Sequence, residues 1–342
     1  MSRERPRFAT IEDVARRAGV SKMTVSRVIR GHASVRAETR ERVLRAIEEL
    51  DYFPNSTARA LVNDVTTNVG LVVGHPPRFD DFFNYVAKGA ELELARRGYS
   101  LILVMQQLDE GDLPMVVRQR KVDGLLLGGP EIRQTLIESL QAKHIPCVLL
   151  ANRVDYPPVP SVCADDFGGA MAAVQHLVSL GHERIAFVGT RRTFYHVQER
   201  FRGYAVALKM AGLPVRPEWC VEVAYSQEEG RSASRELLEK PDRPTAIFYS
   251  GDLLALGGIE AARDLGLSVP GDVAVVGFDD IQTAALLDPP LTTVRVDKEE
   301  MGRLAVELLF EAMENPSAQP RAVKIPTELV IRRSCGAAIV GQ

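Results

Sequence analysis

The chain has 342 residues, too many for one small domain and enough for large buried cores. Residues 1–64 carry a net charge of +4 within an overall charge of −3, so a basic head precedes an acidic body, as is typical of nucleic-acid readers with a regulatory domain. Segment 1–8 lacks the apolar core of a signal peptide, and no apolar run approaches the roughly 20 residues of a membrane span. We therefore expect a cytoplasmic protein without membrane contact.

The sequence offers little for catalysis or metal binding. Its four cysteines form no C-x-x-C pair and no zinc spacing with a histidine, and its six histidines are dispersed. It has no G-x-G-x-x-G after the first predicted strand, no P-loop and no G-x-S-x-G. We expect reduced cysteines, no metal, no cofactor, no catalytic residues and no enzymatic activity. A nucleotide-binding enzyme and an exported transport receptor remain the two rival classes.

The first predicted helix begins after Thr10 and ends at Gly19. Thr10 can cap the helix, and Asp13, three residues further on, can bond back to the cap. Gly19 tolerates a left-handed backbone and so permits a sharp turn. Helical spacing predicts one buried stripe, formed by Ile11, Val14, Ala15 and Ala18.

A second helix is predicted over 22–30 with Ser21 as its cap, and a third over 37–50. The second helix turns Val25, Val28 and Ile29 inward and exposes Lys22, Met23, Ser26 and Arg27. The third has a predicted seam of Val43, Leu44, Ile47 and Leu50. Two short helices around a glycine turn, followed by a third, predict a helix-turn-helix. The alternative is an ordinary amphipathic hairpin whose Lys and Arg are simply solvated.

The second helix suits the major groove of DNA. About nine residues span about 13 Å, which fits a groove about 12 Å wide. Lys22 can donate to guanine and Met23 can contact a thymine methyl, so both are expected to read bases, with Arg27 one turn further on. Helix N-termini favour phosphate, and the expected positioning contacts are Thr10, Ser21, Thr24 and Ser26.

The N-terminal sequence resembles the lactose-repressor (LacI/GalR) family. The matching motifs are Asp13-Val14-Ala15, Ala18-Gly19-Val20-Ser21, Thr24-Val25-Ser26-Arg27-Val28, Thr39-Arg40 and Tyr52-Phe53-Pro54-Asn55. The resemblance implies a hinge helix that starts at Asn55 and places Ala58 and Leu61 at the minor groove, with Arg59 nearby. Leu61 would then wedge between base steps and kink the duplex. Arg36 departs from the family, which usually has a small capping residue before the third helix.

Beyond about residue 63, apolar strand-like runs alternate with helical stretches such as 82–97 and 253–265. The expected strands are 69–73, 101–105, 124–127, 147–150, 185–188, 220–224, 246–249 and 273–276. Such alternation predicts α/β architecture: two lobes of doubly wound parallel sheet behind the helix-turn-helix. Crossings between the lobes are expected near 156–160 and 288–293, and a helix over 298–313 and a strand over 329–332 complete the lobes.

The expected domains are a helix-turn-helix over 1–54, a hinge over 55–64 and an effector-binding and dimerisation core over 65–342. Within the core, the N-lobe takes about 67–160 and 292–326, and the C-lobe about 161–291 and 327–340. The core resembles the periplasmic-binding-protein fold of the same family. The matching blocks are 122–124, 180–186, 200–204, 276–280 and 290–294.

In that fold a ligand binds between the lobes, at the C-terminal ends of the strands. The resemblance implies effector contacts above all from Arg200 and Asp279, because an Arg can donate two parallel bonds and an Asp can accept from vicinal hydroxyls. Weaker candidates are Phe79, Asp80, Asn152, Asp165 and Asp252. Structural alternatives remain: Asp279 could cap the following segment, and Arg200 could pair with Glu199. Gly251 stands where the family often has Asn.

The resemblance therefore implies a dimeric, effector-controlled transcription regulator, most simply a repressor. A two-fold dimer would bind a near-palindromic operator, for which we expect a central CG step. Dimer contacts are expected along the lobes, including helix 82–97, and no trailing leucine heptad predicts a tetramer. A sugar or sugar acid is the expected effector, ahead of a purine or nucleoside. Induction and corepression both remain open.

Overall fold

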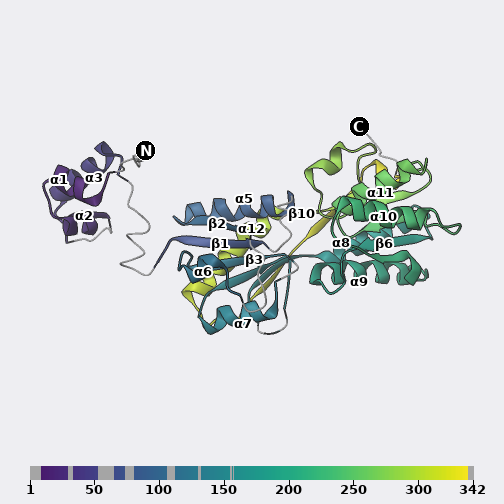
Figure 1. Cartoon of the computed structure of the whole chain (residues 1–342), viewed down its shortest axis with the longest axis horizontal. Helices are drawn as coiled ribbons and strands as arrows, with labels where there is room; N and C mark the ends of the chain where they lie inside the picture. The colour runs from purple at the N-terminus through teal and green to yellow at the C-terminus, as the bar shows by residue number, and fades with distance from the viewer. Residues whose placement is uncertain are drawn as a thin grey trace, which may run out of the picture. The chain divides into compact units, whose positions relative to one another are not determined.

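The computed structural model describes residues 9–29, 34–52, 65–73, 81–105, 112–129, 132–154, 156 and 158–337. The chain divides into two compact units, Met1–Thr67 and Asn68–Gln342. The first unit is helical in its described part, and the second is a larger α/β unit (Figure 1). The described helices of the first unit are α1 (Ile11–Ala18), α2 (Lys22–Ile29) and α3 (Ala37–Glu49).

The first helix has the capping box that its sequence predicts. Thr10 Oγ1 accepts from the Asp13 N–H at 3.3 Å, and the Asp13 carboxylate accepts from the Thr10 N–H at 3.0 Å. Gly19 ends α1 in the left-handed region, with a φ of 65°. The Arg42 guanidinium then donates to the Ala18 carbonyl at 2.7 Å, so α3 ties down the end of α1.

The caps of the next two helices also follow their sequences. Ser21 Oγ accepts from the Thr24 N–H at 3.2 Å at the start of α2. Arg36 precedes α3 without a side-chain cap. The predicted seam of α3 is wrong at Leu44, which is 51% exposed, because it lies about 100° around the helix from inward-facing Val43. The buried core of the unit is Val14, Ala15, Ala18, Val25, Val28, Val43, Ala46 and Tyr52.

The first lobe of the larger unit is built on a parallel sheet. Its strand order is β11 (Ala322–Ile325), β5 (Ser161–Ala164), β4 (Cys147–Leu150), β3 (Gly124–Gly128), β1 (Asn68–Val73) and β2 (Ser100–Met105). One face is covered by α5 (Asp81–Arg96) and α12 (Lys298–Glu314), the other by α6 (Met115–Arg118) and α7 (Gln134–Ala142) (Figure 1). Alternate strand residues therefore enter two separate cores, as in other sheets covered on both faces.

The second lobe repeats this arrangement with a smaller parallel sheet. Its strand order is β7 (Cys220–Glu222), β6 (Ile185–Gly189), β8 (Ala246–Tyr249) and β9 (Ala274–Val276). Helices α8 (Asp166–Ser179) and α9 (Tyr195–Met210) cover one face, and α10 (Gln227–Leu238) and α11 (Asp252–Asp264) cover the other. Short 3-10 turns η1 (Pro217–Trp219), η2 (Gln282–Leu286) and η3 (Arg333–Cys335) complete the lobe.

Two further strands run between the lobes (Figure 1). They are β10 (Thr293–Val296) and β12 (Thr327–Val330), which pair antiparallel as a separate two-stranded sheet. The sequence-based interpretation missed β5, β10 and β11 and placed the last strand two residues too late. It also placed the boundary between the lobes at residues 160 and 161, which is wrong for β5. This strand pairs with β4 and β11 in the first lobe, so the chain crosses to the second lobe after Ala164. The reason is that a four-residue buried strand carries too little periodicity to be recognised.

Candidate DNA-binding and effector-binding sites

The outward face of α2 has the side chains that a DNA-reading helix needs. Met23 is 65% exposed, the largest such value among the large apolar side chains of the described helical unit. Lys22 and Arg27 are also exposed, whereas Val25 and Val28 are buried. The Lys22 ammonium bonds Glu12 of α1, an exposed ion pair of a kind that contributes little to stability.

The hydroxyls at the two helix N-termini are engaged locally. Thr10 Oγ1 donates to the Asp13 carboxylate at 2.7 Å, within the capping box. The Ser21 and Thr24 hydroxyls lie 2.9 Å apart, so one donates to the other. Ser26 is partly exposed on the same helix. These groups are positioned rather than free, which suits them to orient a backbone contact and not to specify a base.

Six predicted site residues lie outside the described residues. They are Asn55, Ala58, Arg59 and Leu61 of the expected hinge, and Phe79 and Asp80 of the expected effector site. The remaining predicted effector residues are all described. They follow the C-terminal ends of strands or lie on a helix that faces those ends.

Arg200 is the centre of the candidate effector site. It lies on α9, is 4% exposed and spreads its guanidinium over the Phe278 ring, 3.7 Å from the ring centroid. Its Nε donates to Asp166 at 2.8 Å, its Nη1 donates to the Ser250 carbonyl, and its Nη2 forms an ion pair with Asp279 at 3.0 Å. The alternative partner Glu199 instead pairs with another arginine of α9. Three loops that follow strands therefore converge on one buried cation.

Burial and charge act in opposite directions on this cluster. Burial raises the pKa of Asp166 to about 6, although Arg200 opposes the rise. Burial also raises the pKa of Asp279, against the pull of Arg200 and Lys298. Burial alone would lower the pKa of Arg200, but the two carboxylates outweigh it and raise that pKa. The guanidinium therefore stays charged and holds both carboxylates by ion pairing.

Asp252 is fully buried at the start of α11, but both of its oxygens are used by the protein. One accepts from the Thr293 hydroxyl at 2.5 Å and the other from the Ile281 N–H at 2.9 Å. Burial, with repulsion from Asp279, raises the pKa of Asp252 to about 8. The side chain ties α11 to the loop after β9 and to β10, so its contacts are internal in this structure.

Asn152 and Asp165 also use their side chains locally. Asn152 is buried after β4, and its Oδ1 accepts from the Arg153 N–H at 2.8 Å. Asp165 caps α8 by accepting from the Gly168 N–H at 3.2 Å, and it pairs with Lys324 at 3.3 Å. Both follow the C-terminal ends of strands, β4 and β5, and their side chains are bonded within the protein.

His196 lies near Arg200 and was not among the site residues predicted from the sequence. It precedes Arg200 by one helical turn on α9, and its ring stacks against Phe194. Its Nδ1 is buried and has no hydrogen-bond partner. Burial, together with the nearby Arg200 charge, lowers the pKa of His196 to about 3, so the ring is neutral.

Comparison with known proteins matches both units. The model of bacterial regulatory proteins of the lacI family matches residues 10–55, and a periplasmic binding protein-like domain matches residues 174–335. Catabolite control protein A of Priestia megaterium is 36% identical over 329 residues, which cover 95% of this chain and 98% of that protein. This chain belongs to the LacI family.

Other relatives agree with this LacI-family assignment. The HTH-type transcriptional repressor PurR of Mannheimia succiniciproducens is 35% identical over 96% of this chain and 98% of its own length. Among solved structures, the lac repressor dimer bound to operator and the anti-inducer ONPF has a TM-score of 0.85 at 27% identity, covering 97% of this chain and 100% of its own. A complex of the transcriptional regulator CelR with cellobiose has a TM-score of 0.74 at 32% identity, covering 95% and 99%.

These matches establish the general activity of this LacI-family chain. It is a DNA-binding transcriptional repressor regulated by effector binding, and its relatives are regulators rather than enzymes. The helix-turn-helix head and the periplasmic-binding-protein-like core are confirmed. Among the described residues, no helix is long and apolar enough to cross a membrane. Within the same part of the chain, no group of three or more His, Cys, Asp or Glu is placed to hold a metal ion.

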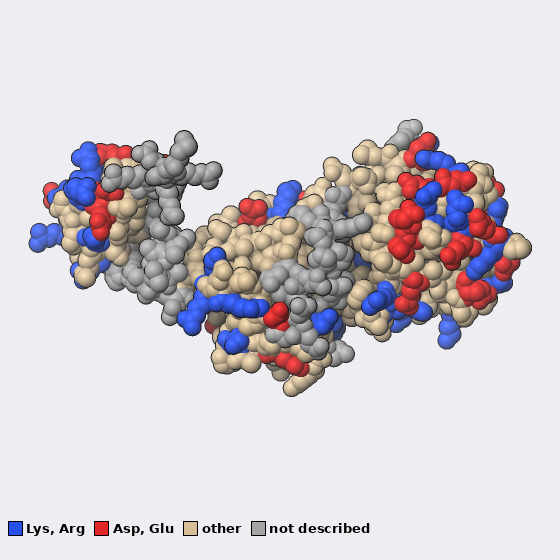
Figure 2. Space-filling model, viewed as in Figure 1, with Lys and Arg blue, Asp and Glu red and all other residues tan. Residues whose placement is uncertain are grey.

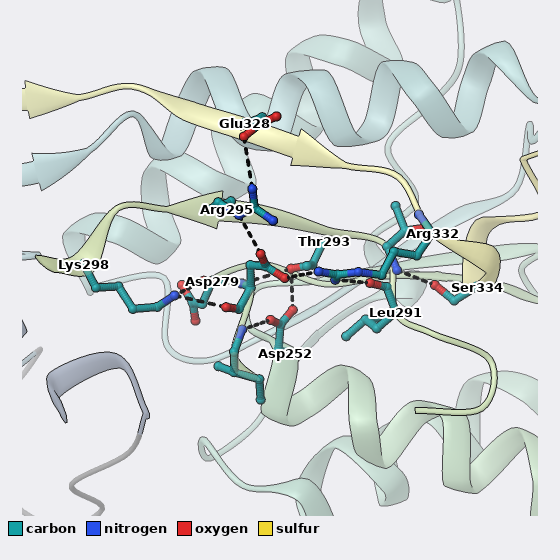
Figure 3. A network of polar contacts seen from close by, with 12 residues as sticks. Asp252, Asp279, Leu291, Thr293, Arg295, Lys298, Glu328, Arg332 and Ser334 are labelled. Carbon is teal, nitrogen blue, oxygen red and sulfur yellow. Dashed lines mark hydrogen bonds and ion pairs between the residues drawn. The ribbon is translucent and has the colours of Figure 1, made fainter. Parts of the chain in front are cut away.

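A second network of polar contacts surrounds the loop that carries Asp279 (Figure 3). Asp280 accepts from Arg295 of β10 and from Arg332, which follows β12, each at 2.7 Å. Burial alone would raise the pKa of Asp280, but these two hydrogen bonds outweigh it and lower the pKa below its ordinary value. Lys298, at the start of α12, donates to the carbonyls of Asp279 and Asp280. The loop after β9 is thus bound to both interlobe strands and to a helix of the first lobe.

An open cavity of about 640 Å³ adjoins this network, and Asp280, Arg295 and Lys298 are among its lining residues. Its lining includes Tyr85 and Leu92 of α5, Arg295 and Asp297 around β10, and Arg303 of α12. Arg200 and Asp279 do not line it. The cavity is therefore separate from the Arg200–Asp279 pair. Each of the arginines that line it is paired with an adjacent carboxylate, of α5, of α12 or of the loop after β9.

On the face of the second lobe shown in Figure 2, basic and acidic side chains are interleaved. Arg231 and Arg235 of α10 both pair with Asp264 of α11, at 2.6 and 3.7 Å. A mixed surface of this kind does not concentrate positive potential, unlike a nucleic-acid-binding patch. The outward face of α2 therefore remains the candidate DNA-reading surface.

Several residues in and beside the candidate effector site were not predicted from the sequence. Asp166 directly follows the predicted Asp165, but recognising it required the strand β5, which is too short to stand out. His196 could have been found from its helical spacing with Arg200. The ion pairs of Asp280 with Arg295 and Arg332 join residues that are 15 and 52 positions apart in the chain. No local sequence pattern predicts such pairs.

Proposed function

We propose that this chain represses an operon for the use of a carbohydrate or sugar acid, through an operator affinity controlled by an effector bound between its two lobes. The observation that carries the proposal is the buried Arg200, held between Asp166, which follows β5 of the first lobe, and Asp279, which follows β9 of the second. Ligands of open α/β sheets bind at such strand ends. The carboxylate and guanidinium groups offer the acceptors and donors that hydroxyl-rich molecules require.

For the DNA site, we propose that Lys22 and Met23 read base edges and that Arg27 assists them one turn further on. The exposure of all three on α2 supports this assignment. Thr10, Ser21, Thr24 and Ser26 would orient the helix on phosphates. The expected hinge residues Asn55, Ala58, Arg59 and Leu61 stay predictions from the family resemblance.

We further propose that the chain works as a homodimer on a near-palindromic operator, since a two-fold dimer presents two equivalent recognition helices. LacI-family members dimerise, and the structurally similar lac repressor was solved as an operator-bound dimer. Such a protein works where the chromosome lies, in the cytoplasm. The predicted contact surface includes α5, whose Leu92 is 53% exposed.

We propose that the effector signal passes through the adjacent residues Asp279 and Asp280. Asp279 is bound to the Arg200 cluster, and Asp280 is bound to Arg295 and Arg332 at the interlobe strands. A ligand that shifts Asp279 therefore pulls directly on the crossing strands. Such a connection between two packed arrangements is what coupling between distant sites requires.

Operator selection tests the proposal. Purified full-length protein would be incubated with random duplex DNA, and the retained DNA sequenced, with and without a panel of sugars, sugar acids, purines and nucleosides. We expect a near-palindrome with a central CG step that is lost when one ligand is added. Enrichment that requires a ligand would identify a corepressor instead. No enriched sequence under any condition would contradict the DNA-reading role itself.

A further inference from the structure

An ion pair joins the first two helices of the DNA-reading unit at the end of α2 that is proposed to meet bases. Lys22 is the first residue of α2, and its ammonium bonds the carboxylate of Glu12, in the first turn of α1. The two side chains are 60% and 56% exposed. The pair therefore lies on the surface of the unit, where a DNA duplex can reach both groups.

The stability of the unit does not require Glu12 at this place. The capping box of α1 is made by Asp13, whose carboxylate accepts from the Thr10 N–H at 3.0 Å. An exposed ion pair such as Glu12 with Lys22 contributes little to stability. A carboxylate on a DNA-binding surface is also repelled by the phosphates. Glu12 therefore weakens DNA binding unless its carboxylate finds a hydrogen-bond donor on the DNA.

The contact with Lys22 places that carboxylate where such a donor exists. In a helix-turn-helix, the first helix crosses the DNA backbone, and the N-terminal residues of the second helix contact base edges. Glu12 belongs to α1, but its bond to Lys22 holds it beside the N-terminus of α2. A hydrogen-bond acceptor and a cationic donor are thus adjacent at the base-reading end of the recognition helix.

This arrangement complements one kind of base pair. In the major groove, guanine presents N7 and O6 as acceptors, and the paired cytosine presents its N4 amino group as a donor. The Lys22 ammonium can donate to guanine while the Glu12 carboxylate accepts from cytosine. An A·T pair in the same orientation reverses both groups, because the adenine amino group replaces O6 and thymine O4 replaces the cytosine amino group. Each side chain would then face a group like itself.

We propose that Glu12 is a specificity-determining residue of the DNA-reading surface, which reads one G·C pair of each half-site together with Lys22. Lys22 binds the guanine and Glu12 the cytosine. The inference rests on the proposed base-reading role of Lys22 and adds an acidic partner to it. At other sequences the carboxylate meets no donor and is repelled by the DNA. Glu12 therefore increases the ratio of specific to non-specific binding rather than the affinity itself.

The variant Glu12→Gln tests this role. Glutamine keeps the length of the side chain, but it carries no charge and can donate as well as accept, so it tolerates thymine O4 as well as the cytosine amino group. We expect the preference for G·C over A·T at one position of each half-site to fall by about fivefold or more. Affinity for DNA of unrelated sequence should be equal to that of wild type or higher. Full-length protein would be titrated, by fluorescence anisotropy, with operator duplexes that carry each base pair at each half-site position.

Glu49→Gln is the matched control. It makes the same chemical change in the same unit and breaks another exposed ion pair, that of Glu49 with Arg17 at 2.6 Å. Because both variants lose one negative charge, an effect of net charge alone would appear in both. The base preference of the control should equal that of wild type. Circular dichroism would show that each variant folds.

The double variant Glu12→Gln with Lys22→Ala tests whether the two side chains act as a pair. Without Lys22 the carboxylate is no longer held at the end of α2. We therefore expect Glu12→Gln to change the base preference of Lys22→Ala by less than about twofold, since residues in contact have non-additive effects. Effects of the two substitutions that multiply in full would contradict joint reading of one base pair.

The outcomes separate this inference from the proposed role of Lys22. If Glu12→Gln binds every operator duplex more tightly by the same factor, Glu12 only repels phosphates and the inference is wrong. If Lys22→Ala alters base preference and Glu12→Gln does not, the inference is wrong but base reading by Lys22 stands. If neither variant alters any preference, the proposed role of Lys22 fails as well.

Discussion

Asp279 and Asp280 are adjacent in the chain, but their side chains bind different arginines. Asp279 faces the buried guanidinium of Arg200 at 3.0 Å. Asp280 instead accepts from Arg295 and Arg332, at 2.7 Å each; Figure 3 shows these two arginines. Both residues have positive φ, 106° and 50°, a backbone conformation that non-glycine residues seldom adopt. The strained dipeptide is held by Lys298, which donates to both of its carbonyls. One short segment therefore joins the proposed ligand site to the crossing strands.

Replacing Asp280 should uncouple ligand binding from operator release. Asp280→Asn removes the charge that holds Arg295 and Arg332, so the crossing strands lose their link to the loop after β9. We expect effector affinity to stay within about threefold of wild type, while the effect of saturating ligand on operator affinity falls by a factor of about 5–10, within the usual range of coupling energies. Operator titrations with and without ligand measure both quantities.

The control for this variant is Asp288→Asn, because Asp288 is exposed in the same lobe and pairs with Arg333. In this variant, saturating ligand should change operator affinity as much as it does in the wild-type protein. Full ligand response in Asp280→Asn, with normal folding, would show that the interlobe ion pairs only support the fold.

Lys22→Ala should relax base preference at one position of each half-site. The loss of a direct base contact is expected to cost about 1–3 kcal/mol of specific binding. Its exposed ion pair with Glu12 adds little to stability, so the variant should fold normally. Operator variants measured by fluorescence anisotropy would show the change. Arg17→Ala, which breaks an exposed pair with Glu49, is the control and should leave base preference as it was.

Leu61→Ala should weaken operator binding and reduce DNA bending, because an apolar wedge that unstacks a base step would be lost. Leu61 lies outside the described residues, so this expectation rests on the family resemblance alone. Bending is measurable from energy transfer between dyes at the ends of a short operator duplex. Effector affinity should be largely intact, and bending equal to that of wild type would remove the wedge assignment.

The buried carboxyl of Asp252 should make stability fall as pH rises. Burial raises its pKa to about 8 from an ordinary value of 3.8, so between these values the folded protein holds a proton that the unfolded chain has lost. This contribution to stability is complete below pH 3.8 and is lost as pH rises to about 8. Asp252→Asn resembles the protonated form and keeps partners for Ile281 and Thr293.

The melting temperature of wild type should therefore fall, relative to that of Asp252→Asn, between pH 5 and pH 9. Differential scanning calorimetry of both proteins in the same buffers measures this difference. Asp242→Asn, an exposed substitution in the same lobe, should show no such trend relative to wild type. A constant difference between wild type and Asp252→Asn across the range would mean that Asp252 stays ionised.

Local sequence was sufficient wherever a few neighbouring residues decide the structure. The capping box of Thr10 and Asp13, the left-handed Gly19 and the missing cap at Arg36 were all predictable, because each depends on contacts within four residues. The same holds for the long apolar strands and for helices with clear periodicity. Leu44 shows the limit, since adjacent apolar residues on a helix cannot both face the core.

The candidate ligand site was predictable in part. Arg200 and Asp279 were found through the family resemblance, and the structure brings them within 3.0 Å of each other. Asp166 and His196 were missed because their importance depends on what surrounds them. The burial of an ion pair, or of an unpartnered nitrogen, is a property of several segments packed together and leaves no local pattern.

The sequence by itself determined the helix-turn-helix head, the two α/β lobes and the family, since these follow from periodicity, capping and motif spacing. Tertiary structure decided where the chain crosses between lobes and which charges meet. Asp252, Asp280 and Arg332 find their partners across 15 to 52 residues of chain. The reason is that the segment after β9 runs beside the start of β10, and β10 pairs with β12. Burial of these segments then raises the pKa values of Asp166 and Asp252, which no local sequence pattern predicts.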